Sequence, residues 1–107
     1  METVMLFGVR ILDLGEVTVT VQEREELVRG KPFTARLYRR RGLARYIERD
    51  GSERLADEAT FYDCGADGVS RAYTLHREPV PDEEEREIGR RHIRETVAQA
   101  LSAQGIW

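Results

Sequence analysis

Few side chains in this chain of 107 residues could carry acid–base, nucleophilic or metal chemistry. There are two histidines, His76 and His92, and a single cysteine, Cys64. Histidine titrates near neutral pH, and a reactive cysteine needs a lowered pKa and a base within reach. Cys64 stands before Gly65 at a predicted hairpin end, a place typical of a half-buried structural residue. We therefore expect no catalytic residue, no metal ligand and no cofactor.

No short motif with a known catalytic mechanism occurs in the sequence. There is no Gly-rich phosphate loop, no Cys-x-x-Cys pair, no His-Glu-x-x-His helix and no Gly-x-Ser-x-Gly turn. Each of these motifs sets a nucleophile, a base or a group of ligands at a fixed spacing. We therefore expect a protein that is not an enzyme.

Arginines and tyrosines gather between Phe33 and Glu48, on a predicted hairpin. Guanidinium groups beside tyrosine rings could contact phosphates and stack on bases. The net charge of −3 and the acidic stretch at residues 82–87 count against a dedicated nucleic-acid binder. The alternative is a charged sheet face whose arginines pair with carboxylates. The candidate contacts for nucleic acid or an anion are Arg36, Tyr38, Arg39, Arg40, Arg41, Arg45, Tyr46 and Arg71.

The densest apolar run, Val4–Leu14, predicts a strand with apolar residues on both faces. Such a strand is covered on both sides, by closure of a small barrel or by self-association. A tryptophan at residue 107 would pack back on its own sheet or fill a pocket of a neighbouring subunit. The candidate contacts with a second copy or a protein partner are Val4, Leu6, Leu12, Ile88, Ile106 and Trp107.

Four three-residue segments that end in glycine predict hairpin loops. They are Asp13-Leu14-Gly15, Arg40-Arg41-Gly42, Arg49-Asp50-Gly51 and Ala66-Asp67-Gly68. Loops of this length pair residues of the same parity, so odd-numbered side chains from Met5 to Leu75 should share one apolar face. The valines of the half-buried strand Val17–Val21 belong to that face, and Asp63 is predicted opposite Arg71. Residues 23–32 are predicted to be a mobile charged connector, which could form a helical turn or extend the strand.

The last part of the sequence predicts one long helix over residues 82–104. Asp82 suits the N-cap, and Glu85 stands at the capping-box position. An apolar stripe follows, made of Ile93, Val97, Ala100 and Leu101. Gly105 is placed as a left-handed C-cap. We expect this helix to cover the odd-numbered face of the sheet.

A chain of this length predicts a single domain, residues 1–107. The prediction is an α+β fold: a six-stranded antiparallel meander in a two-plus-four arrangement, curled or like a small barrel, with one long C-terminal helix. No apolar run reaches the ~20 residues of a membrane span. One cysteine cannot form an intrachain disulfide, which favours a reducing compartment. We therefore expect a cytoplasmic protein that does not enter a membrane.

Three functions fit these features. The first is a non-enzymatic, self-associating structural or protein-interaction module, such as a viral or defence-related assembly component or an adaptor. The second is a nucleic-acid-binding protein that uses the hairpin at residues 33–48. The third is a binder of a small anionic ligand or nucleotide. A fold alone does not select among them. The two-faced first strand, the apolar residues 106–107 and the missing catalytic motifs favour the first, with a homo-oligomer or another protein as partner.

Overall fold

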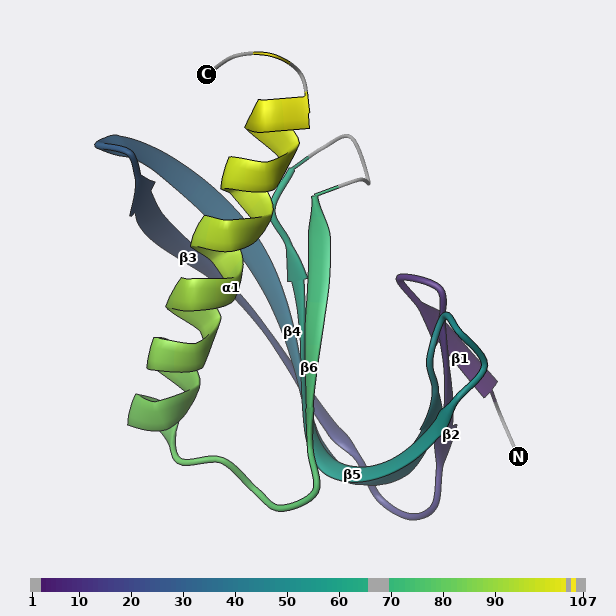
Figure 1. The fold of residues 1–107 in the computed structure, drawn as a ribbon. Helices are drawn as coiled ribbons and strands as arrows, with labels where there is room; N and C mark the ends of the chain where they lie inside the picture. Colours follow the sequence, from purple (N-terminus) through teal and green to yellow (C-terminus); the bar gives the residue numbers. More distant parts are fainter. Residues whose placement is uncertain (1–2, 66–69, 104, 106–107) are drawn as a thin grey trace.

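The computed structural model describes residues 3–65, 70–103 and 105. They form six strands in one antiparallel sheet and one long helix (Figure 1), which confirms the α+β class. The sheet is not closed into a barrel. In the strand order β1-β2-β4-β5-β6, β1 and β6 lie at opposite ends and do not pair with each other. The elements are β1 (Thr3–Leu6), β2 (Val9–Asp13), β3 (Thr18–Val28), β4 (Lys31–Ile47), β5 (Glu53–Asp63), β6 (Arg71–His76) and α1 (Asp82–Ala103).

The sheet is organised around β4, which has 17 residues. Its first part pairs with β3 and its last part with β2, while β5 pairs along its other edge. The predicted single strand Val4–Leu14 is wrong. The chain turns at Phe7 and Gly8, whose φ angles are 52° and 80°. Two successive positive φ angles are those of a two-residue type I′ hairpin, so this run folds on itself as β1 and β2.

Two of the four predicted loops are wrong. The segment at residues 13–15 does not join paired strands, because β2 and β3 both pair with β4. The segment at residues 40–42 lies inside β4, where the pairing with β5 shifts register between Arg41 and Ala44. This shift is a β-bulge, and Gly42 has a φ of 136° there.

The loop at residues 49–51 is confirmed. The backbone N–H of Glu48 donates to the carbonyl of Ser52 at 2.8 Å, and Gly51 has a φ of 89°. The loop predicted at residues 66–68 lies outside the described residues. The pair Asp63 and Arg71, predicted to face each other across that hairpin, is confirmed.

Of the two forms predicted for the charged connector at residues 23–32, a helical turn or an extension of the strand, the structure shows the strand. Residues 23–28 continue β3, and their partners in β4 run from Arg36 to Lys31. The chain reverses at Arg29 and Gly30, whose φ angles are 50° and 80°. This is a second type I′ turn, so the charged residues lie on a regular strand.

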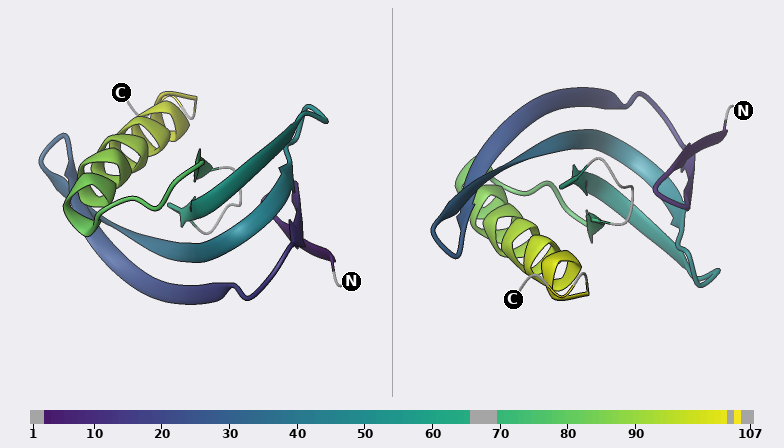
Figure 2. Two further views of the ribbon diagram at one scale, coloured as in Figure 1. Left: turned by 90° about the horizontal axis from the view of Figure 1, so that it is seen from below. Right: turned by 90° about the horizontal axis from the view of Figure 1, so that it is seen from above.

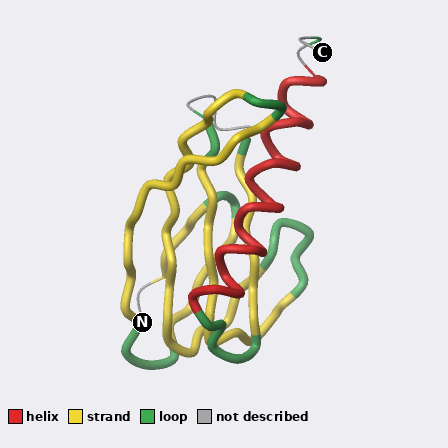
Figure 3. Tube along the Cα trace, turned by 90° about the vertical axis from the view of Figure 1, so that its left-hand side faces the viewer, coloured by secondary structure: helices red, strands yellow, loops and turns green. Residues whose placement is uncertain are grey.

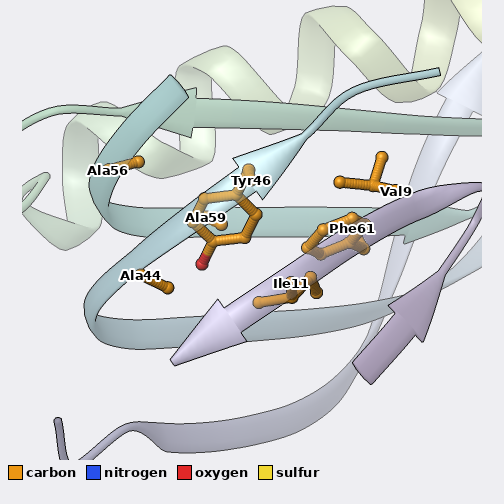
Figure 4. Packing of buried hydrophobic residues seen from close by; sticks show 7 residues of the cluster. All are labelled: Val9, Ile11, Ala44, Tyr46, Ala56, Ala59 and Phe61. Carbon is orange, nitrogen blue, oxygen red and sulfur yellow. The ribbon is translucent and has the colours of Figure 1, made fainter. Parts of the chain in front are cut away.

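Two apolar clusters lie on opposite sides of the bent sheet. The first fills the inside of the bend and takes residues from β2, β4 and β5 (Figure 4): Val9, Ile11, Ala44, Tyr46, Ala56, Ala59 and Phe61. The second lies beneath α1 and contains Val28, Ala35, Leu37, Tyr62, Cys64, Ile93 and Val97. Figure 2 shows the same arrangement from two further sides, with α1 on one side of the curved strands and the β1–β2 hairpin at their far end.

The prediction that odd-numbered side chains share one face beneath α1 is wrong, because the two clusters divide them. Phe61 and its neighbour Tyr73 face the inner cluster, whereas Tyr62, the next residue along β5, faces the helix. Ala35 and Leu37 of β4 do lie beneath α1, whereas the β1–β2 hairpin covers the buried odd-numbered apolar side chains of β5. The Phe7 ring meets the Phe61 ring edge-on, with 5.7 Å between centroids. Both Ala56 and Ala59 face the same cluster although they differ in parity, which the register shift at the bulge explains.

The helix agrees closely with the prediction. It covers Asp82–Ala103 and lies across one side of the sheet (Figure 3). Ile93 and Val97 are buried, and Gly105 takes the expected left-handed φ of 72°. Glu85 differs from the capping-box prediction, because its carboxylate is buried against Arg24 of β3.

Candidate interaction surface

A cluster of charged side chains joins the start of α1 to the middle of the sheet. The guanidinium of Arg39 donates to Asp82 at 2.8 Å, to Glu58 at 3.1 Å and to the carbonyl of Val80 at 2.8 Å. Glu58 is fully buried and also accepts from Arg41 at 3.3 Å. Hydrogen bonds from Arg39 and Arg41 lower the pKa of Asp82 below its usual range. The buried pair of Arg39 and Glu58 lies within the sheet, and the helix reaches it through Asp82, whose side chain is 74% exposed.

A second set of ion pairs continues this arrangement. Arg24 of β3 donates to the buried Glu85 at 2.9 Å. Arg40 pairs with Asp13 at the end of β2. A polar hollow of about 110 Å³ lies between β3, β4 and α1, and both arginines and carboxylates line it: Gln22, Arg24, Arg39, Asp82, Glu85 and Arg86. Because the lining carries both signs of charge, it selects neither an anion nor a cation.

The arginine and tyrosine residues predicted to contact nucleic acid do not form one exposed face. Tyr46 is fully buried in the inner cluster, and burial raises the pKa of its hydroxyl. Arg39 and Arg40 are 7% and 5% exposed and are held by carboxylates. Tyr38 is half-buried, with its ring 6.2 Å from that of Phe7.

The remaining candidates are dispersed over the surface. Arg36 is exposed, and Arg41 divides its hydrogen bonds between Glu58 and Asp82. Arg45 pairs with Glu53 at 2.6 Å on the surface. Arg71 lies over the Phe7 ring, 4.7 Å from its centroid. Carboxylates or aromatic rings therefore already engage most of the cationic groups that a phosphate would need.

The residues that could do chemistry are placed as structural groups. Cys64 is buried, and burial raises the pKa of its thiol to about 11, so it is protonated at neutral pH. The His92 ring stacks on Tyr62 with 5.9 Å between centroids, and burial lowers its pKa. Among the described residues, no group of three or more histidine, cysteine or acidic side chains could hold a metal ion. No described helix has the length and apolar character needed to cross a membrane.

The free edge of β3 is the most prominent unpaired surface of the described strands. β3 has 11 residues and pairs with β4 along one edge only. Val19 and Val21 are 49% and 54% exposed, which contradicts their predicted place in the core. An edge strand presents unpaired N–H and C=O groups that can pair with another chain. We call residues Thr18–Gln22, which carry no charge, the β3 edge segment.

The residues predicted to contact a second copy differ in their exposure. Val4 on β1 is 36% exposed, and its neighbour Met5 is 61% exposed. Leu6 is half-buried against the inner cluster, and Leu12 and Ile88 are also half-buried. Ile106 and Trp107 lie outside the described residues. β1, like β3, pairs along one edge only, so part of the predicted surface lies at a second free edge.

Comparison with protein-family models, with characterised proteins and with solved structures gives no match for this chain. Its function is therefore inferred from the geometry of its own residues.

Sequence reasoning missed the β3 edge segment as a surface. The alternation Val-Thr-Val-Thr-Val at residues 17–21 correctly predicts a strand with one apolar face. The alternation does not say whether another element covers that face. In the structure β3 pairs with residues 31–41 of β4, and β2 pairs with residues 44–47 of the same strand. The β1–β2 hairpin therefore covers this side of the sheet at β4 but does not cover the valines of β3.

Proposed function

We propose that the protein is a non-enzymatic interaction module that associates with copies of itself through the free edge of β3. One observation carries this proposal. Val19 and Val21 are half exposed, whereas Val9 and Ile11 of β2 are fully buried. Their strand, β3, has an outer edge with which no other described strand pairs. Strand addition at this edge would satisfy the backbone groups and reduce the exposure of the valines at the same time.

The distribution of charge along β3 supports a specific contact. Residues 23–26 are all charged, and Glu26 and Arg24 pair with α1. Charged residues on an edge strand oppose non-specific pairing. The β3 edge segment carries no such protection over five residues. Along β3, pairing is therefore centred on this segment.

The states of the other groups support a non-enzymatic role. The arginines that could bind a substrate phosphate are held by carboxylates of β5 and α1. The single thiol is buried and protonated. The exposed apolar residues at the sheet edges, in contrast, are only partly covered by contacts within the fold.

The solution mass tests the proposal. We expect light scattering to give a mass that rises toward at least a dimer as the concentration increases from about 1 µM to a few hundred µM, the range of modest interfaces. Val21→Lys places a charge on the segment and should shift this transition at least ~10-fold in concentration. Leu27→Lys is the matched control, because Leu27 lies on the same strand and is 55% exposed, against 54% for Val21. A monomer at all concentrations, or equal effects of the two variants, would contradict the proposal.

A further inference from the structure

We infer that the β3 edge segment pairs antiparallel with the same segment of a second copy, about a two-fold axis that passes through Thr20. This inference rests on the proposed self-association and adds its partner strand and register. A two-fold axis makes such a contact self-complementary, because each residue meets the same surface on the other copy. The two sheets then join into one continuous sheet through their β3 strands.

The sequence of the segment suits this pairing. Residues opposite each other across an antiparallel two-fold have numbers that add to 40 when Thr20 lies on the axis. Val19 then faces Val21 of the second copy, Thr18 faces Gln22, and the two Thr20 residues face each other. Opposed β-branched pairs and Thr–Thr pairs are favourable across strands. By the symmetry the pair of Val19 and Val21 forms twice, and each pair reduces the exposure of both valines.

Charge opposes registers centred further along β3. An axis through Glu23 would set that carboxylate against its own copy, and an axis through Arg24 would set Glu23 against Glu25. Like charges directly opposite each other destabilise a strand pair. With the axis at Thr20, Glu23 faces Val17 and Arg24 faces Glu16 of the second copy, so no like charges are opposed.

The helix leaves the segment accessible. α1 contacts β3 through Arg24, which pairs with Glu85 at 2.9 Å, and through Glu26, which pairs with Arg90 at 3.5 Å. Both residues lie beyond the segment, toward the β3–β4 turn. Thr18 and Thr20, on the helix side of the sheet, are exposed. The two-fold carries the second helix toward the opposite end of the joined strands, so the helices do not compete for the same space.

Spin-label distances test the register. Thr18→Cys, Thr20→Cys and Gln22→Cys are each made in a Cys64→Ala background, labelled with a nitroxide and studied by dipolar electron paramagnetic resonance. Directly opposed Cα atoms are ~5 Å apart, and each step away from the axis adds ~7 Å along the strands. The distance between labels should be shortest at position 20, and longer and similar at positions 18 and 22. Light scattering of each labelled protein gives its mass under the same conditions.

The outcomes separate this inference from the proposal beneath it. The expected pattern of distances supports the register. An associated protein with its shortest distance at another position, or with no short distance at any of the three, overturns the register and leaves self-association standing. A monomeric parent chain overturns both. The same labels at Leu27→Cys should give a much longer distance, ~50 Å along the strands, because seven residues separate it from the axis.

Discussion

Glu58 is the residue whose loss of charge should destabilise the fold most. It is fully buried and accepts hydrogen bonds from both Arg39 and Arg41. Glu58→Gln would leave the buried Arg39 guanidinium with Asp82 as its only remaining carboxylate among the ion pairs of the described residues. We expect it to lower the free energy of unfolding by about 3 kcal/mol, the usual cost of breaking a buried pair.

Urea unfolding measures this loss, and Glu53→Gln is the matched control. Glu53 also accepts from an arginine, Arg45 at 2.6 Å, but both side chains are about half exposed. Such surface pairs contribute about 0–1 kcal/mol because water screens them. Similar losses in the two variants would show that burial does not strengthen the Glu58–Arg39 pair.

His92 predicts a pH dependence of stability in a range where carboxylates do not titrate. Burial against Tyr62 lowers its folded-state pKa from the ordinary value of 6.5. The unfolded chain therefore binds the proton more readily, and stability falls as the pH decreases from about 6.5 through the lowered pKa. Unfolding in urea at several pH values between about 7 and 5 should show this slope.

His92→Gln should remove the slope. His76→Gln should keep most of it, because burial is the largest cause of the lowered His92 pKa and the charge of His76 is the last of the causes. Unchanged slopes in His92→Gln would contradict the assignment.

The charged pairs at this scale could not be predicted from the sequence. Arg39 and Asp82 are 43 residues apart, and composition shows only that both signs of charge are abundant.

At the scale of elements, Gly42 sets the bulge that divides β4. Its φ is 136°, and a Cβ there would lie 2.4 Å from the carbonyl oxygen of Glu16 and 3.0 Å from Val17. Backbone cannot move aside as a flexible side chain can. Gly42→Ala should therefore lower the free energy of unfolding by ~2 kcal/mol or more.

Thermal and urea unfolding check this expectation, and Gly15→Ala is the control. Gly15 has no neighbouring atom within 4 Å of an added Cβ, so its substitution should change stability by less than ~0.5 kcal/mol. A stable Gly42→Ala variant would mean that the bulge does not need glycine.

The bulge also shows where element prediction from the sequence succeeds and where it fails. Arg49-Asp50-Gly51 and Arg40-Arg41-Gly42 look alike, and only the first is a hairpin loop. The second continues a strand because β2 and β3 both pair with β4, a tertiary contact that local sequence does not encode. Phe7-Gly8 was missed for a similar reason, since phenylalanine rarely adopts a positive φ. The helix was predicted well because its caps and apolar stripe are local signals.

At the scale of the whole molecule, the two apolar clusters are joined through β5. Phe61 faces the inner cluster and the adjacent Tyr62 faces the helix cluster, so neither cluster can lose its packing without disturbing the same strand. The inner cluster is closed by the first residues of the chain and the helix cluster by the last element. We therefore expect one cooperative unit with no stable half-folded state.

Ile93→Ala tests this coupling, because Ile93 is fully buried on the sheet-facing side of α1 and does not belong to the inner cluster. The substitution should lower the free energy of unfolding by about 2–5 kcal/mol. Amide hydrogen exchange followed by NMR should then show the same loss of protection in β2 as in α1, since both exchange through global unfolding. Ala98→Gly, at a half-buried helix position, should lower protection by only ~1 kcal/mol in both elements. Loss confined to α1 in Ile93→Ala would mean that the sheet and its inner cluster are stable without the helix.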